Sequence, residues 1–324
     1  MLVYTLKRLL ASVPVMLASS FAVFCLVALS GDPLARLREQ PGVSAEAIAA
    51  RSKALDLDQP LVLRYLGWIT DVLHGNLGRT LDGQPVAAEL GRAFGVTMRM
   101  VVTAAVIAVL LAVGVGVLSA VRRNTVWDHA STLTAFLLFS MPVFFLAGVL
   151  KDLAIRLNEA TGYVIFSTVG ERGSNTAAGL FAVVADRVGH MVLPTLTLVL
   201  VTFAAWSRYQ RASMLEVLRS DFLRTARAKG VRERTVLFRH GLRNALIPLT
   251  TIVAVDFATL VNGSIVIETV FAWNGLGRLF ITSLQQGDVR LSTAWLLLAA
   301  GAVVVFNLVA DIVYALLDPR IRHA

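Results

Sequence analysis

Charged side chains are scarce in this sequence. Asp, Glu, Lys and Arg make up only 16% of its 324 residues, against 56% hydrophobic residues and a mean hydropathy of +0.72. A soluble globular domain carries about 25% charged residues. The shortage excludes a soluble domain and indicates an integral membrane protein, which is best described by its membrane crossings. We expect a single membrane domain over residues 1–324.

Cysteine and lysine are nearly absent. Because Cys25 is the only cysteine, no disulfide can form within the chain. A phosphate-binding P-loop needs a lysine followed by Ser or Thr. The lysines of this chain are followed instead by Arg, Ala, Asp and Gly, at Lys7, Lys53, Lys151 and Lys229. The sequence therefore contains no P-loop with which to hydrolyse ATP.

Local motifs for catalysis and metal binding are also missing. The five histidines lie far apart in the sequence, so no two of them form a ligand pair on one helix. A Gly-x-Ser-x-Gly nucleophile motif is absent as well. We therefore predict no catalytic residue, no metal site and no cofactor bound by this chain.

Six apolar segments stand out as membrane crossings. They cover residues 9–30, 100–121, 133–150, 191–206, 246–267 and 291–317. The first one follows two basic residues like a secretory signal, but its 22 residues exceed the apolar region of a signal peptide, which has about 7–15. We predict a retained helix there, and an all-α protein with six transmembrane helices.

The distribution of Lys and Arg predicts the orientation, because cytoplasmic loops carry an excess of both. Six crossings place the two termini on one side. That side holds sixteen basic residues against five acids, whereas the other side holds fourteen of each. We therefore expect both termini in the cytoplasm. The net charge of +9 follows from this topology, without a nucleic-acid partner.

Residues 31–99 are too long for a connector, and we predict a helical extracytoplasmic insertion between the first two transmembrane helices. Ser44 is a typical N-cap for a first helix, and Pro60 is a typical start for a second one that ends at Gly75. Apolar residues at helical spacing would share one face of the second helix, namely Val62, Leu66, Ile69 and Leu73.

Residues 207–245 form a basic cytoplasmic loop in this topology. The sequence predicts a short amphipathic helix, a left-handed turn at Gly230 and a second helix. Three interpretations remain open from the residues alone: a solvated basic loop, a DNA-binding helix-turn-helix, and a docking element for a cytoplasmic partner. The small side chains of Ala226 and Ala228 favour docking, because they allow close approach of another backbone.

The loop resembles a known motif. Arg224-Thr-Ala-Arg-Ala-Lys-Gly230, followed by Arg239-His240, Leu242-Arg-Asn-Ala245 and Pro248, is similar to the EAA loop of ABC importer permeases. Further motifs resemble the oligopeptide/dipeptide (OppB/DppB-type) branch, in this order along the chain: Leu57-Asp-Gln-Pro60, Gly75-Asn-Leu-Gly-Arg79, Ser140-Met-Pro-Val-Phe144, Glu268-Thr-Val-Phe271, Gly275-Leu-Gly-Arg278 and Asp318-Pro-Arg-Ile-Arg322.

The resemblance implies a type I ABC importer permease fold and a peptide cargo in the inner membrane of a bacterium. It also implies a second homologous permease, two ATPase subunits that hold ATP and Mg, and an extracytoplasmic substrate-binding protein. The loop would be a coupling helix that contacts the ATPase through Arg224, Thr225, Ala226, Ala228, Lys229, Gly230, Arg239 and His240. Thr225 replaces the glutamate that names the motif, and Arg232 takes a position where an N-cap is expected.

Polar residues inside the apolar segments are costly and indicate function or helix pairing. Asp256, with Thr259 and Asn262, is expected to line the translocation path, with a buried interhelical hydrogen bond as the alternative. Asn307 and Asp311 are expected to have a structural role. Asp256 and Asp311 also suggest a second function, a stand-alone secondary transporter or channel, although the inverted repeats of such proteins are absent.

Overall fold

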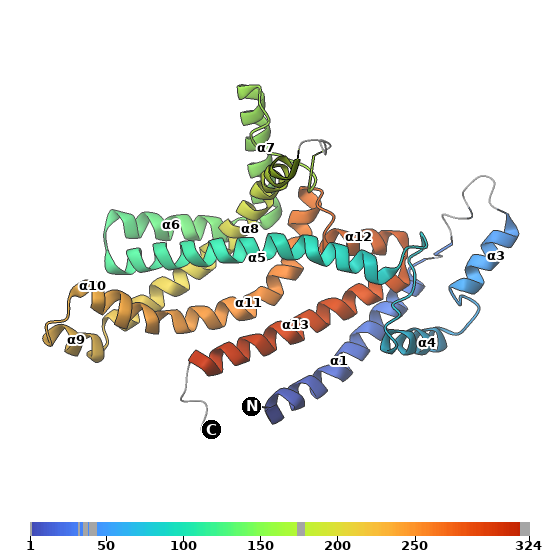
Figure 1. Ribbon diagram of the computed structural model, residues 1–324, viewed down its shortest axis with the longest axis horizontal. Coiled ribbons are helices and arrows are strands. Elements are labelled where there is room, and N and C mark those ends of the chain that lie inside the picture. The colour runs from blue at the N-terminus through green and yellow to red at the C-terminus, as the bar shows by residue number, and fades with distance from the viewer. Residues whose placement is uncertain (1, 32, 35–37, 39–43, 174–178, 318–324) are drawn as a thin grey trace. The chain divides into compact units, whose positions relative to one another are not determined.

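The computed structural model describes residues 2–31, 33–34, 38, 44–173 and 179–317. Every regular element within these ranges is a helix, as the all-α prediction requires (Figure 1). The chain forms two compact units. The first comprises Met1–Val96 and Gly275–Val304, and the second comprises Thr97–Asn274 and Val305–Ala324. Two long helices, α5 (Val86–Val121) and α13 (Val289–Leu317), contribute residues to both units.

The first unit also contains α1 (Leu2–Leu29), α3 (Ala45–Ala54), α4 (Leu61–Leu73) and α12 (Leu276–Gln286). Tyr65 joins α4 to α1, because its hydroxyl lies 2.7 Å from the hydroxyl of Ser20 and its ring packs edge-on against Phe24. The buried face of α4 is therefore the one with Tyr65 and Trp68. The apolar face predicted from helical spacing is the more exposed one, with Val62 and Leu66 each at least half exposed.

The second unit is built around α8 (Gly179–Leu218), which packs against three helices. These are α6 (Val126–Ser140), α7 (Val143–Thr161) and α11 (Arg243–Val270). Two short helices follow α8, namely α9 (Asp221–Ala228) and α10 (Glu233–Thr235). They lie near the last turn of α8 and the first turn of α11 (Figure 1). A π-helix, η1 (Val236–Leu242), joins α10 to α11 without a break.

Among the described residues, four helices are long and apolar enough to cross a membrane: Leu10–Leu29, Val86–Val121, Phe181–Leu218 and Val289–Val309. Two bent helix pairs raise this number to six if each pair is one span. The segment 133–150, predicted as one span, is divided between α6 and α7 with a bend of 106°. Met141 is extended and Pro142 is the N-cap of α7, because a residue before proline avoids the helical conformation.

Several helices run beyond the predicted segments. Helix α5 begins at Val86, within the stretch assigned to the insertion, and α8 continues to Leu218, within the stretch assigned to the cytoplasmic loop. Pro194 lies inside α8 and Pro248 lies inside α11. Hydropathy reports only the apolar part of a helix, whereas its polar ends continue with the same backbone geometry.

Gly116 on α5 marks the closest approach between α5 and α8. A Cβ atom at Gly116 would lie 2.9 Å from the carbonyl oxygen of Ser207 and 2.9 Å from the Cβ of Gln210. A Cβ atom at Gly114 would meet nothing within 4 Å. Small residues allow helices in membranes to approach closely. Gly116 has this role, while Gly114, which the sequence suggests equally, does not.

We predict that Gly116→Ala destabilises the protein by about 1–3 kcal/mol, because the added methyl group overpacks the α5 and α8 contact. Gly114→Ala is the matched control. It should leave stability unchanged or raise it by up to about 1 kcal/mol, since alanine is the better helix former. Unfolding of both variants in detergent measures the difference. Equal effects at the two positions would contradict the assigned contact.

Candidate functional site

The loop between α8 and α11 presents a short helix to solvent. Helix α9 ends at Ala228 with Lys229 as its C-cap, and Gly230 follows with a φ of 75°, so the left-handed turn is confirmed. Leu223 is fully buried and anchors α9 against η1. Gly241 on η1 packs on this anchor, because a Cβ atom there would be in van der Waals contact with Leu223 at 3.6 Å and with Met214 at 3.4 Å.

The outer surface of α9 is small and basic. Thr225, Ala228 and Gly230 are exposed, whereas Ala226 is half-buried. Arg224, Lys229 and Arg239 are exposed around them, and His240 is half-buried on η1. The predicted loop residues therefore lie on neighbouring elements, and exposed small residues form the end of α9.

An ion pair joins α9 to the next helix. The guanidinium of Arg227 donates to the Glu233 carboxylate at distances of 3.0 and 3.1 Å. Arg232 is the N-cap of α10 and makes no side-chain capping hydrogen bond, as its residue type leads one to expect. The pair between Arg227 and Glu233 thus orients the start of α10 where a capping side chain is missing.

A cavity of about 530 Å³ lies between α6, α8 and α11. Its wall contains aromatic, basic and acidic side chains: Thr132, Phe136, Phe139, Ala205, Arg208, Tyr209, Arg211, Ala212 and Asp256. The Asp256 carboxylate accepts a hydrogen bond from the indole Nε1 of Trp206 at 2.8 Å. Asp256 therefore makes the interhelical hydrogen bond that was one of its two expected roles, and it also lines this cavity. Its place on the translocation path stays a prediction.

Thr259 and Asn307 do not line this cavity. Thr259 is exposed and donates to the backbone oxygen of Asp256 within its own helix. Asn307 is half-buried on α13. The side chains of Asn262 and Asp311 lie outside the described part of the chain.

Arg211 and Asp128 form an ion pair that the sequence analysis did not find. Arg211 donates from Nε and from one terminal nitrogen to the two carboxylate oxygens, at 2.6 and 2.8 Å. Asp128 is only 1% exposed, and it also accepts from the backbone N–H of Asn124 at 3.0 Å. The local signal was the spacing of Thr125 and Asp128, since a Thr N-cap with an acid three residues later is typical of a helix start.

Glu268, part of a motif that carried the family resemblance, is fully buried on α11. Its carboxylate accepts from the hydroxyl of Thr97 at 2.6 Å and from that of Ser264 at 3.0 Å. Two hydroxyl donors compensate part of the cost of burying the carboxylate. The sequence indicated that Glu268 matters, but it did not identify Thr97 as a partner.

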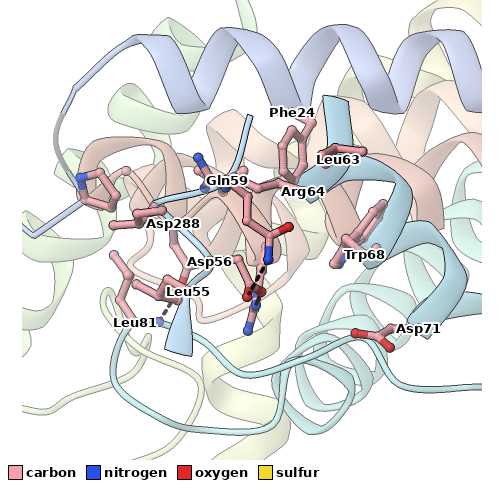
Figure 2. Close-up of a pocket in the computed structure, with 16 residues that line it drawn as sticks. Phe24, Leu55, Asp56, Gln59, Leu63, Arg64, Trp68, Asp71, Leu81 and Asp288 are labelled. Atoms are coloured by element: carbon pink, nitrogen blue, oxygen red, sulfur yellow. Dashed lines mark hydrogen bonds and ion pairs between the residues drawn. The ribbon is translucent and has the colours of Figure 1, made fainter. Parts of the chain in front are cut away.

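The first unit contains a second, smaller cavity of about 270 Å³. Figure 2 shows Asp56 and Gln59 pointing toward one another at its wall, and Asp288 beside Leu81. Asp56 also pairs with Arg290 at 3.3 Å. The pair between Asp56 and Arg290 attaches the loop before α4, with the Leu57-Asp-Gln-Pro60 motif, to the first turn of α13.

Asp288 makes a second attachment, between the segment around Leu81 and the start of α13. Its carboxylate accepts backbone N–H bonds from Leu81 at 2.7 Å and from Leu291 at 3.0 Å, and it is 3% exposed. Burial raises the pKa of Asp288 above the usual range of an aspartate, although the two N–H donors oppose the shift. The site is a structural clamp on the predicted insertion.

The described residues are helical, several of their helices are long and apolar enough to cross a membrane, the short helix α9 is exposed, and the sequence contains no P-loop. A family described as "Binding-protein-dependent transport system inner membrane component" matches residues 112–323. The oligopeptide transport system permease protein OppB of Mycobacterium tuberculosis is 38% identical over 320 residues, which are 98% of each chain. The glutathione transport system permease protein GsiC of Salmonella choleraesuis is 38% identical over 325 residues, with both chains covered to 100%.

A solved structure shares the fold. It is a chain of the MetNI methionine ABC transporter in an inward-facing conformation, with a TM-score of 0.53 and 18% sequence identity over 71% of this chain and 96% of that chain. The chain belongs to the family of inner membrane components of binding-protein-dependent transport systems. The resemblance to importer permeases of the oligopeptide branch is thereby confirmed.

We predict that Arg211→Met lowers stability by about 3–5 kcal/mol, because it leaves the Asp128 carboxylate buried without its cation. The double variant with Asp128→Asn should recover part of this loss, since no uncompensated charge then remains. Unfolding in detergent of the wild type, both single variants and the double variant gives the coupling energy. Additive losses would show that the two side chains act independently.

We predict that Asp288→Ala loosens the segment around Leu81, because two buried N–H groups lose their acceptor at about 1–3 kcal/mol each. Amide hydrogen exchange of the peptide that contains Leu81 should become faster. Asp71→Ala, an exposed acid on α4 in the same unit, is the control and should leave the exchange unchanged. Unchanged exchange in Asp288→Ala would contradict the clamp.

Proposed function

We propose that this chain is the membrane-spanning permease subunit of an ATP-driven ABC importer for peptides. The observation that carries the proposal is the exposed, small-residue end of α9 between the long helices α8 and α11. The sequence contains no P-loop, which supports a system in which two partner ATPase subunits hydrolyse the ATP. The relatives are named for the transport of oligopeptides and of glutathione, which supports a short peptide as the cargo.

The proposed topology has six crossings, with each bent helix pair counted as one span, and both termini in the cytoplasm. The excess of Arg and Lys at the termini and in the loop between α8 and α11 supports this orientation. The insertion before α5 is then extracytoplasmic, where a substrate-binding protein can dock on it. A second, homologous permease completes the translocation path.

The described contacts suggest how α9 transmits force. Leu223 is buried at the junction with η1, and Met214 on α8 forms a buried cluster with Ala120 and Ala245. The hydroxyl of Ser213 donates to the backbone oxygen of Ala245 at 2.9 Å, which ties α8 to α11. A push on α9 therefore moves the ends of α8 and α11 together, because close-packed contacts transmit displacement.

A stand-alone secondary transporter or channel that uses Asp256 and Asp311 is the second candidate, and membership of this family does not favour it. The two candidates differ in what drives transport. Uptake by the lone chain in liposomes under a proton gradient would support the secondary transporter. Uptake that requires ATP and the partner subunits would support the importer.

We predict that Ala228→Glu weakens the response of the complex to its loaded binding protein about tenfold or more, because a carboxylate on the docking face introduces bulk and an unpaired charge. The measurement is ATP hydrolysis by the reconstituted complex, with and without loaded binding protein. We choose Ala228 over Gly230, since the φ of 75° at Gly230 strains any side chain.

The matched control is Arg219→Gln, which makes the same change in net charge at an exposed position outside α9. It should retain the stimulation of ATP hydrolysis. Full stimulation in Ala228→Glu would contradict the docking role of α9.

A further inference from the structure

Arg208 on α8 lies over two aromatic rings at the wall of the larger cavity. Its guanidinium carbon is 4.2 Å from the ring centroid of Phe136 and 5.3 Å from that of Phe139. These rings are themselves 50% and 60% exposed, so the stacked group borders open space. Ring contacts occupy the face of a guanidinium and leave its in-plane N–H donors available.

The other charged side chains of this cavity make polar contacts of their own. Arg211 is paired with Asp128, and the Asp256 carboxylate accepts from Trp206. Among the described residues, Arg208 makes no ion pair within 4.0 Å and no side-chain hydrogen bond. Arg208 therefore presents a positive charge with free in-plane donors beside aromatic surface, in a cavity whose wall also holds the Asp256 carboxylate.

We propose that Arg208 binds the terminal carboxylate of the peptide during its passage, with the last side chain of the peptide against Phe136 and Phe139. The inference rests on the proposed function and names the part of the cargo that this chain recognises. A planar guanidinium matches a carboxylate with two parallel hydrogen bonds. The volume of about 530 Å³ lies within the range of about 300–1,000 Å³ that is usual for small-molecule sites.

The experiment uses the full complex in proteoliposomes with its binding protein. It compares ATP-dependent uptake of a tripeptide that has a free terminal carboxylate with uptake of the same tripeptide as its terminal amide, both at concentrations that saturate the binding protein. We expect the wild type to prefer the carboxylate form by about tenfold or more, as for a charge-assisted bidentate contact. Arg208→Gln should abolish the preference by slowing uptake of the carboxylate form alone.

Two further variants complete the comparison. Arg208→Lys keeps the charge and should retain part of the preference for the carboxylate peptide. It replaces Arg208→Gln in the experiment if the complex with that variant does not assemble. Arg187→Gln removes an exposed arginine from the same helix and should behave as the wild type. If the binding protein does not bind the amide, uptake cannot compare the two peptides. Their affinities for the purified complex without the binding protein are then measured directly.

The outcomes separate the possible errors. A wild type without preference, or a preference unchanged in Arg208→Gln, overturns the assignment to Arg208. Equal slowing of both peptides in Arg208→Gln also overturns it, since a contact with lipid phosphate or a packing role would act on both. A wild-type complex that imports neither peptide contradicts the proposed function itself, which is a different result.

Discussion

The ion pair between Arg211 and Asp128 fixes the position of α8 in the second unit. Two charge-assisted hydrogen bonds join helices that are distant in the sequence, and the carboxylate is almost fully enclosed. A buried pair of this kind contributes more to the uniqueness of an arrangement than to its stability, because desolvation offsets much of the attraction. Once α8 is fixed, Trp206 reaches Asp256 on α11, and Arg208 reaches the rings on α6.

Helix α8 therefore carries two kinds of contact along its length. Arg208 faces the cavity, while Gln210 packs where Gly116 leaves space on α5. One turn further along α8, Met214 belongs to the buried cluster with Ala120 and Ala245, close to Leu223 of α9. The same rigid element connects the cavity to the exposed loop, so movement at one end is felt at the other without any contact between cargo and α9.

Local features of this fold could be predicted from the sequence. Gly230 was expected to be left-handed because glycine follows a short helix there, and it is. Pro142 could have predicted the bend, but the apolar run across it suggested a continuous helix. Contacts between distant residues, such as Arg211 with Asp128 or Glu268 with Thr97, could not be predicted, because one sequence does not reveal which helices become neighbours.

The π-helix η1 also constrains how this chain can change. A π turn holds about one residue more than an α turn, and each residue of an α-helix rotates the chain by about 100°. Loss of a single residue from Val236–Leu242 would convert η1 to an α-helix. Helix α11, which follows directly, would then be rotated about its axis relative to the residues before η1. Asp256 would then face away from Trp206. The length of this segment is therefore under a stricter constraint than the identity of most of its side chains.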